Sequence, residues 1–393
     1  MNGSDIVILS AARTPMGSFQ GELASITAPQ LGAAVIREAV SRAGLKPEDI
    51  GEAVMGCVLP AGLGQAPARQ AARYGGLPDA VPATTVNKVC GSGMKAVMIA
   101  ADQLGMGRAD IIVAGGMESM TNAPYLLPGA RKGLRLGHAE VKDHMFLDGL
   151  EDAYEGRLMG TYAEDAAKHY QFTREAQDAY AMESLKRAKR ATDDGSFNDE
   201  IVAVTVKGKG GDTLVLQDEQ PRKADPAKIP TLKPAFSKDG TVTAANSSSI
   251  SDGAAALVLA RADAAQKLGK KPRARIVAQA SHAGEPRWFT SAPVGAIEKV
   301  LKLANWSKND VELWEINEAF ANVAMIAMKE LGLDHAKVNV NGGACALGHP
   351  IGASGARLLV TLLHAMEKRG AKRGVASLCI GGGEATAVAI ERM

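Results

Sequence analysis

The sequence predicts an α/β protein built from two repeated halves, with a loop domain inserted in the first half. Three observations predict this fold class: strand-like and helix-like segments alternate, a stretch of the first half recurs near the end, and the middle of the chain differs in composition. The chain has 393 residues, 46% hydrophobic and 4% aromatic, and 43 of them are glycine. Such a chain can bury a large core, and many glycines with turns set by the backbone are typical of layered α/β proteins.

The alternation of strands and helices begins at the N-terminus. Residues 5–10 (DIVILS) form a short apolar, β-branched run that predicts a buried strand, and residues 29–44 place apolar side chains at helical spacing up to a terminal glycine. A second strand is expected at 53–58. A helix rich in small residues follows at 89–105, and a buried strand at 111–114 is expected to end at a pair of glycines.

The internal repeat indicates two homologous halves. Residues 38–50 can be laid over residues 299–311, and both stretches predict a helix, a Gly or Asn stop, a turn, and an Asp that leads into a strand. Residues 112–118 (IVAGGME) likewise resemble residues 378–384 (LCIGGGE). We therefore expect the second half of the chain to repeat the α/β design of the first.

The inserted segment is richer in charge and in proline than its flanks. It contains one clear amphipathic helix at 173–194, with Thr173 as its N-cap. The basic residues 186–190 on that helix are interpreted as a solvated face rather than a phosphate site, and residues 131–135 are equally ambiguous. The expected domains are an N-terminal half (residues 1–118 and 245–269), an inserted loop domain (119–244) and a C-terminal half (270–393).

Charge and cysteine content exclude several classes of protein. Lys plus Arg number 45 and Asp plus Glu 43, a net charge of +2 that is too balanced for a general nucleic-acid binder. No apolar run approaches the roughly 18 residues of a membrane span, and the N-terminus does not resemble a signal peptide. The four cysteines form no C-x-x-C pair, which argues against a metal site or a disulfide framework. We expect a cytoplasmic protein with free thiols.

Cys90 is the first candidate for chemistry. It lies in NKVCGSGMK, between an extended segment and a helix, where unpaired backbone N–H groups and the helix dipole are expected to lower a thiol pKa. A nucleophile is one interpretation of this segment. A buried structural cysteine in a glycine-lined turn is the other.

Three further segments offer groups suited to acyl transfer. His349 lies in the glycine-rich loop 341–355 (NGGACALGHPIGASG), where it could act as a base near neutral pH, although a lone loop histidine is more often structural. Cys379 runs into Gly381 and its neighbours, whose backbone N–H groups can stabilise an oxyanion. Asn317 follows an expected strand at 312–316 and can hold a water or an enolate oxygen. A nicotinamide site is rejected, because no G-x-G-x-x-G follows the first strand.

Taken together, the segments NKVCGSGMKAV, GGMESM, NEAFA, GGACALGHPIGASG and CIGGGEA resemble, in order and spacing, the thiolase family and, within it, the short-chain acetyl-CoA C-acetyltransferases. The resemblance covers the whole chain, including TAANSSSISDGAAALVL at 243–259. It implies the five-layered α-β-α-β-α thiolase fold. It also implies an acyltransferase that condenses two acetyl-CoA to acetoacetyl-CoA plus CoA, or cleaves short-chain 3-ketoacyl-CoA by thiolysis, with ping-pong kinetics. A homotetramer is expected.

The resemblance also implies roles for single residues. Cys90 takes the acyl group, His349 activates it, and Cys379 exchanges the α-proton of the second substrate. His349 and a water on Asn317 form one oxyanion hole, and the N–H groups of Cys90 and Gly381 form the other. No metal is implied, and no cofactor beyond the substrate CoA or acetyl-CoA.

The resemblance implies that coenzyme A (CoA) lies over the inserted loop domain, which also contacts other subunits. Ser248 is placed near the pantetheine amide, and Arg222, after a one-residue gap in the alignment, is placed against the adenine. Two positions depart from a common biosynthetic pattern, which leaves the acyl preference open: Leu158 stands where many members have His, and Phe289 stands where many have Met. The remaining pocket residues are Met159, Ala319 and Phe320.

Two other functions compete with the thiolase interpretation. A β-ketoacyl synthase-type condensing enzyme shares the fold but uses one Cys with two His, or with His and Asn, and Cys379 argues against it. A thiolase-like lipid carrier would lack the catalytic thiols, both of which are present. The sequence does not indicate whether flux runs toward condensation or cleavage.

Overall fold

The two halves form matching arrays of strands on either side of a central ladder. The computed structural model describes residues 3–393, and its main sheet has the order β12-β13-β14-β11-β1-β10-β5-β3-β4, with β2 paired to β10. The strands are β1 (Ile6–Arg13), β2 (Gly17–Ser18), β3 (Glu52–Gly56), β4 (Ala83–Val86), β5 (Ile111–Ser119), β10 (Ser251–Arg261), β11 (Ala274–Ala283), β12 (Leu313–Ile316), β13 (Arg373–Ile380) and β14 (Glu384–Arg392).

The pairing pattern confirms the internal repeat. In the first half β3 is parallel to β5, and β5, β10 and β1 are successively antiparallel. In the second half β12 is parallel to β13, and β13, β14 and β11 are successively antiparallel. A short antiparallel ladder between β1 and β11 joins the two half-sheets. The repeat therefore extends beyond single segments to the whole strand topology.

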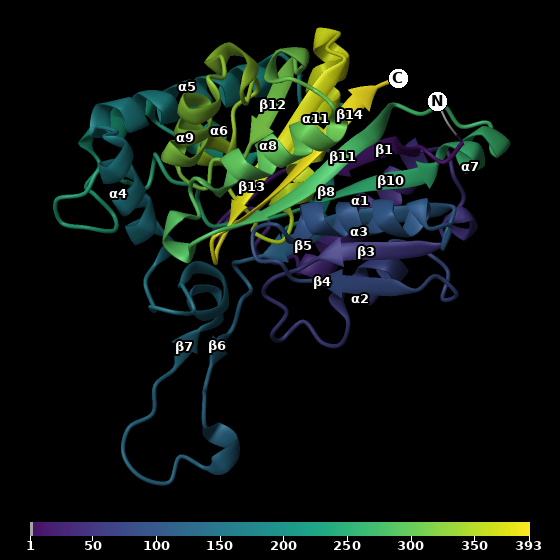
Figure 1. Ribbon diagram of the computed structural model, residues 1–393. Helices are drawn as coiled ribbons and strands as arrows, with labels where there is room; N and C mark the ends of the chain where they lie inside the picture. The colour runs from purple at the N-terminus through teal and green to yellow at the C-terminus, as the bar shows by residue number, and fades with distance from the viewer. Residues whose placement is uncertain (1–2) are drawn as a thin grey trace.

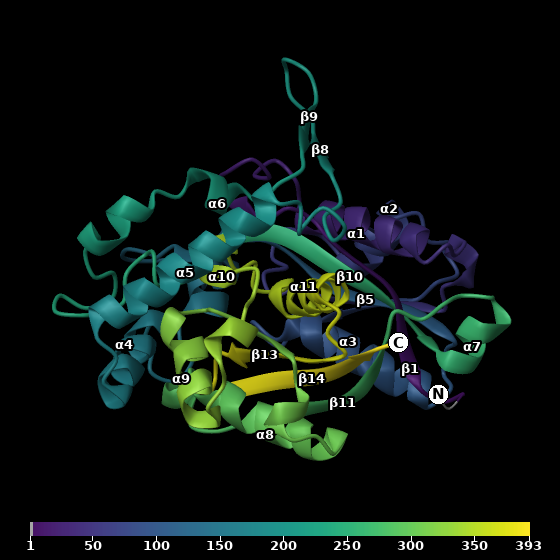
Figure 2. The same cartoon turned by 90° about the horizontal axis from the view of Figure 1, so that it is seen from above.

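The helices cover these half-sheets in three layers, which completes the five-layered α-β-α-β-α architecture. Helices α1 (Ala28–Arg42) and α2 (Pro67–Tyr74) cover the outer face of the first half, and α8 (Ala292–Ala304) and α9 (Ala321–Leu331) lie on the outer side of the second. Helices α3 (Ser92–Gly105) and α11 (Ser354–Arg369) lie between the halves (Figure 2). Separate clusters of buried aliphatic side chains fill the outer and central layers.

The segment between β5 and β10 leaves the layered body at two hairpins. Figure 1 shows the β6–β7 hairpin extending far from the sheet, and Figure 2 shows β8–β9 doing so on another side. Thr173 accepts a hydrogen bond from the Ala176 N–H at 3.2 Å, which confirms it as the cap of α5. The elements of this segment are β6 (Tyr125–Leu126), η2 (Ala130–Lys132), β7 (Lys142–Asp143), the π-helix η3 (Phe146–Leu150), α4 (Met159–Tyr170), α5 (Arg174–Asp193), β8 (Val204–Val206), β9 (Thr213–Val215), α6 (Glu219–Lys223) and η4 (Pro226–Thr231).

The remaining elements are short turns of helix at the edges of the layers. They are α7 (Ala262–Lys267), α10 (Ala344–Leu347), and the 3₁₀ turns η1 (Pro47–Asp49), η5 (Pro286–Trp288), η6 (Lys308–Asp310) and η7 (His335–Lys337). In residues 3–393, no helix has both the length and the hydropathy needed to cross a bilayer.

The glycine pair expected to end a strand does not end it. Strand β5 runs through Gly115 and Gly116 to Ser119, and both glycines pair with β10. A Cβ on Gly115 would lie 2.0 Å from the Ala255 carbonyl oxygen, and one on Gly116 would lie 2.0 Å from that of Gly352. These glycines therefore permit close packing. In the second half, Gly382 and Gly383 adopt φ of 90° and 86° and turn the chain into β14.

The basic residues of α5 are not a uniformly solvated face. Arg187 donates to the Val338 carbonyl at 2.7 Å, and Arg190 donates to that of Val340 at 2.5 Å. Lys189 donates to the Ala224 carbonyl at 2.9 Å. Lys186 and Arg190 are exposed, as the sequence interpretation expected. Arg187 and Arg190 thus bind α5 to the loop that leads toward His349, because the backbone carbonyls of that loop need hydrogen-bond donors.

Candidate active site

Cys90 lies in a tight turn between β4 and α3. Val89 before it has a left-handed φ of 45°. The Ser92 hydroxyl fixes this turn, because it accepts from the Lys88 N–H at 2.8 Å and donates to the Val89 carbonyl at 2.6 Å. A Cβ on Gly91 would lie 2.3 Å from Ile380, so only glycine lets the end of β13 pack against this turn. The nucleophile candidate is thereby brought to the second half of the molecule.

The two predicted catalytic thiols lie together. Cys379 is fully buried near the end of β13, and its sulfur is close enough to Cys90 that charge on one raises the pKa of the other. The N–H groups of Gly381 and of Cys90 itself point at the Cys90 sulfur. The structure thus groups Cys90 with Cys379 and Gly381, and Cys379 lies 379 − 90 = 289 residues after Cys90 in the sequence.

The expected lowering of the Cys90 pKa is wrong for the site without substrate. Burial raises the pKa of Cys90 to about 11, the N–H groups of Gly381 and Cys90 oppose that rise, and the Glu118 carboxylate adds to it. Burial also raises the pKa of Cys379 well above its usual value. Both thiols therefore rest protonated, and a base is needed to make a nucleophile.

His349 has the chemistry of such a base. Burial, with a smaller effect of the Arg357 charge, lowers the pKa of His349 to about 3, so the imidazole is neutral at pH 7. The Ser354 hydroxyl donates to the Pro350 carbonyl at 2.9 Å, and its oxygen lies 2.5 Å from His349 Nδ1. Because the hydroxyl proton is already used, Nδ1–H is the donor to Ser354. The free lone pair of His349 is then on Nε2.

Asn317 lies beside this free nitrogen. The Asn317 Nδ2 group is 3.4 Å from His349 Nε2, and both side chains are buried. Asn317 Oδ1 has no hydrogen-bond partner although it is inaccessible to solvent. A buried amide oxygen without a partner is costly, and a water bound there would satisfy it. This arrangement fits the predicted pairing of His349 with a water held by Asn317.

An apolar cluster of side chains packs around Cys379. Phe289 and Phe320 pack edge to face with ring centroids 6.2 Å apart, and Phe236 packs the same way on Phe320 at 5.9 Å. Met159 and Ala319 belong to the same cluster, so four of the predicted acyl-pocket residues are grouped with the thiol. Phe236, Tyr162, Val242 and Val323 also belong to it but lie outside the recognised motifs, and only the fold reveals them.

The other predicted CoA contacts lie outside this cluster. Leu158 is the half-buried residue before α4 and pairs with Glu151 in an isolated bridge. The Ser248 hydroxyl donates to the Ala319 carbonyl at 3.0 Å, which ties it to the pocket wall. Arg222 forms an ion pair with Glu22 at 2.6 Å. In the structure Ser248 therefore contacts the edge of the apolar cluster, and Arg222 is paired with a carboxylate.

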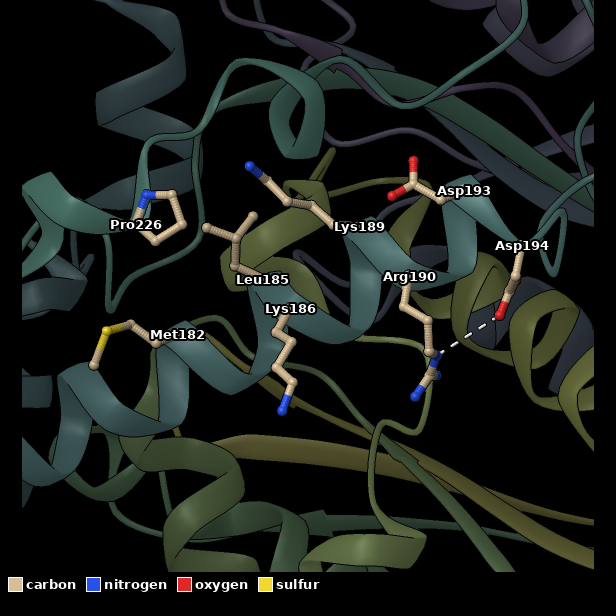
Figure 3. A pocket seen from close by; sticks show the side chains of 8 residues that line it. All are labelled: Met182, Leu185, Lys186, Lys189, Arg190, Asp193, Asp194 and Pro226. Carbon is tan, nitrogen blue, oxygen red and sulfur yellow. Dashed lines mark ion pairs between the residues drawn. The ribbon is translucent and has the colours of Figure 1, made fainter.

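Two surface depressions lie on the inserted segment. One, of about 240 Å³, is lined by Ser249, Gln220, Lys223 and Lys228 among others, and so begins one residue from Ser248. Neither lysine was predicted from the sequence to be a binding residue, because the cavity that they line forms only after folding. The other, of about 780 Å³, is an open hollow along α5 (Figure 3), lined by Met182, Leu185, Lys186, Lys189, Arg190, Asp193, Asp194 and Pro226. No predicted site residue lines the latter. Residues 3–393 contain no group of three or more His, Cys, Asp or Glu side chains placed to hold a metal ion.

Comparisons with known proteins identify the family of the chain. The family description "Thiolase, N-terminal domain" matches residues 6–263, and "Thiolase, C-terminal domain" matches residues 270–392. An acetyl-CoA acetyltransferase of Cupriavidus necator is 53% identical over 391 residues, which cover 99% of this chain and 100% of the relative. One from Pseudomonas aeruginosa is 52% identical over 99% of both chains, and a mitochondrial one from Bos taurus is 49% identical over 99% of this chain and 92% of its own. This chain belongs to the thiolase family.

Proposed function

We propose that this chain is an acetyl-CoA acetyltransferase. It condenses two acetyl-CoA to acetoacetyl-CoA and CoA, and runs the reverse thiolysis, through an acetyl group held on Cys90. The observation that supports this most is the meeting of two thiols, the half-buried Cys90 and the buried Cys379, beside the Gly381 N–H and an apolar cluster of side chains. The names and full-length identity of the relatives support the choice of acetyl-CoA as substrate.

The first half-reaction transfers the acetyl group to the enzyme. His349 Nε2 takes the Cys90 proton as the sulfur attacks the thioester carbonyl, because a thiol with a pKa of about 11 is not ionised at pH 7. The C–S bond to CoA then breaks. Cys379, which rests protonated, gives its proton to the departing CoA thiolate. Acetyl-Cys90, protonated His349 and a Cys379 thiolate remain.

The second half-reaction forms the carbon–carbon bond. The Cys379 thiolate removes the α-proton of a second acetyl-CoA, and the resulting enolate attacks the acetyl-Cys90 carbonyl. Acetoacetyl-CoA leaves, and protonated His349 returns its proton to the Cys90 sulfur. All protons are exchanged among side chains and substrates, so the proposal requires no metal and no cofactor beyond CoA itself.

Two sets of donors face the oxygens that gain charge. The N–H groups of Cys90 and Gly381 suit the tetrahedral adduct on Cys90, because they already point at its sulfur. Protonated His349 with a water on Asn317 suits the enolate oxygen, and the unpartnered Asn317 Oδ1 supports that water. Removing one such donor typically costs on the order of 10²–10³ in kcat.

The CoA moiety is proposed to run from the pocket across the inserted segment. Ser248 beside the apolar cluster and the adjoining 240 Å³ cavity provide a path. Lys223 and Lys228 along it would exchange their carboxylate partners, Glu219 and Asp225, for phosphates. Met159, Leu158, Phe289, Ala319 and Phe320 are proposed to enclose the acyl and pantetheine end. Three aromatic rings in the pocket favour short-chain 3-ketoacyl-CoA substrates.

A homotetramer in the cytoplasm is proposed for the assembled enzyme. The β6–β7 hairpin supports the assembly, because it projects from the body and exposes Leu136 at 93% together with Tyr125 and Val141. The two thiols required by the reaction support a reducing compartment. Sedimentation velocity of the full chain and of Leu136→Ser tests the assembly, and a monomeric parent chain would contradict it.

Cysteine substitutions test the assignment of roles. Cys379→Ser should still take one acetyl group from acetyl-CoA but lose condensation, and Cys90→Ser should take none, because a hydroxyl is a far weaker nucleophile at neutral pH. Cys345→Ser is the matched control, since its sulfur contacts the Glu318 carbonyl rather than Cys90. Intact-protein mass spectrometry after incubation with acetyl-CoA gives the result. An adduct on Cys90→Ser that is missing from Cys379→Ser would reverse the roles.

A further inference from the structure

Glu118, at the end of β5, is a fully buried carboxylate that the proposed reaction does not use. It accepts hydrogen bonds from the backbone N–H groups of Val58 at 2.9 Å, Leu59 at 3.2 Å and Gly352 at 2.9 Å. The Cys57 thiol donates to it at 3.7 Å. Within residues 3–393 it forms no ion pair with a basic side chain. Burial raises the pKa of Glu118 to about 7, and the three N–H groups oppose that rise, so above this pH the group carries a buried charge without a counter-ion. Such a charge is expensive, which points to a role that hydrophobic packing could not fill.

The Gly352 bond links Glu118 to the catalytic loop. Gly352 follows His349 by three residues, so its N–H lies in the loop that presents the imidazole. A Cβ on Gly56 would lie 2.8 Å from the Gly352 carbonyl oxygen, and a Cβ on Gly116 would lie 2.0 Å from it. A Cβ on Gly352 would lie 2.5 Å from the Glu118 carboxylate. The loop thus fills a close-fitting slot in the first half, with Glu118 at its base.

We propose that Glu118 is a positioning residue that holds the His349 loop of the second half against the first half, which carries Cys90. This inference rests on the proposed function, because that function makes Cys90 the nucleophile and His349 its base. The two groups come from different halves, so their relative position depends on contacts between the halves. An error of about 1 Å in such an arrangement can cost on the order of 10²-fold in rate.

The charge of Glu118 provides an independent readout. It adds to the rise in the Cys90 pKa that burial causes. Cys379 on β13 also faces Cys90, the proposed reaction brings His349 to it, and the Lys88–Glu384 ion pair lies two residues away along the chain. Neutralising Glu118 should therefore move the alkylation of Cys90 to lower pH. A carboxylate that supported the fold at a distance from the thiol would not move it.

Two substitutions separate position from charge. Glu118→Gln keeps the length but has only one acceptor oxygen, so it loses part of the N–H cradle together with the charge. Glu118→Asp keeps the charge but is one methylene shorter, which draws its oxygens back from the N–H groups of Gly352 and Val58 that both bond Oε2. Asp252→Asn is the matched control, because it neutralises a buried carboxylate on the neighbouring β10 that bonds Ser119 and Thr121 but not the His349 loop.

The measurements are kcat/KM for thiolysis of acetoacetyl-CoA and the pH dependence of Cys90 alkylation by iodoacetamide. We expect about 10- to 100-fold lower kcat/KM in both Glu118 variants. The alkylation profile should move to lower pH only in Glu118→Gln, and Asp252→Asn should match the parent in both measurements. If Glu118→Gln does not fold, the activity of Glu118→Asp decides the question of position.

Parent-like kcat/KM in the folded Glu118 variants would overturn the inference. So would a loss in Glu118→Gln with an unchanged alkylation profile, since that result indicates a structural role only. An inactive parent enzyme would instead overturn the proposed function, and the alkylation profiles would still be readable.

Discussion

Ser354 at the start of α11 is predicted to control which nitrogen of His349 carries the proton. Its hydroxyl donates to the Pro350 carbonyl and so can only accept from His349 Nδ1–H. That hydrogen bond leaves Nε2 unprotonated beside Asn317, ready to accept the Cys90 proton. Ser354→Ala removes the acceptor, and the productive tautomer then leaves a buried N–H without a partner.

The expected loss can be worked out from that missing bond. A buried donor left without a partner costs about 1–3 kcal/mol. If this cost falls on the productive tautomer, acetylation of Cys90 slows about 5- to 150-fold, since 1.36 kcal/mol corresponds to a factor of ten. The thiol pKa should remain where burial sets it, because Ser354 does not contact Cys90. The loss should therefore appear in the acetylation rate at every pH at which His349 is neutral.

Rapid-quench mass spectrometry of the acetyl-enzyme measures this rate directly. Ser377→Ala is the matched control, because its buried hydroxyl donates to the Thr386 carbonyl at 2.9 Å, close to Cys379 but away from His349. Both variants lose a buried hydroxyl and should lose similar stability. Equal acetylation rates in Ser354→Ala and Ser377→Ala would refute the tautomer argument.

Three further predictions concern the pocket, the thiols and the buried imidazole. Phe289→Met replaces a rigid ring by a flexible chain, so the kcat/KM ratio between acetoacetyl-CoA and its 2-methyl derivative should change; identical ratios would show that Phe289 does not set the preference. Mild oxidant should inactivate the enzyme reversibly, because Cys90 lies beside the Cys379 thiol, and peptide mapping that finds Cys90 unmodified in the inactive enzyme would contradict this. His349, with a folded pKa of about 3 against an ordinary value of 6.5, stays neutral when folded and takes up a proton on unfolding below pH 6.5. Stability should therefore fall as pH falls through that range, and His349→Asn should reduce the loss between pH 7 and pH 5 by about 2 kcal/mol in urea unfolding.

Much of the fold could be predicted because its signals are local or repeated. The pattern at residues 29–44 predicted α1 to within two residues at each end, and Thr173 was recognised as a cap from its residue type and position. The recurrence of residues 38–50 at 299–311 predicted the shared topology of the two halves. The glycines of β5 misled the prediction, because a glycine pair reads as a turn unless the packing that requires it is known.

The candidate site residues could be named from the sequence, but their electrostatics could not. Cys90, His349, Asn317 and Cys379 stand in motifs whose order and spacing carried the resemblance, and the fold groups Cys90 with Cys379 and His349 with Asn317. The direction of the Cys90 pKa shift was wrong, because a helix N-terminus is visible in the sequence whereas the burial that outweighs it is not.

That reversal changes how the two thiols must work. With the Cys90 pKa near 11 and that of Cys379 higher than usual, neither sulfur is ionised in the resting site, so a thiolate forms only as a proton moves to His349 or to a leaving CoA. In the proposed reaction, a neutral His349 accepts a proton at the start of the first half-reaction, and a protonated Cys379 donates one at its end. The charge separation that results, an imidazolium and a thiolate, is what the second acetyl-CoA requires. The same burial that keeps the resting thiols inert thus prepares the base for carbon–carbon bond formation.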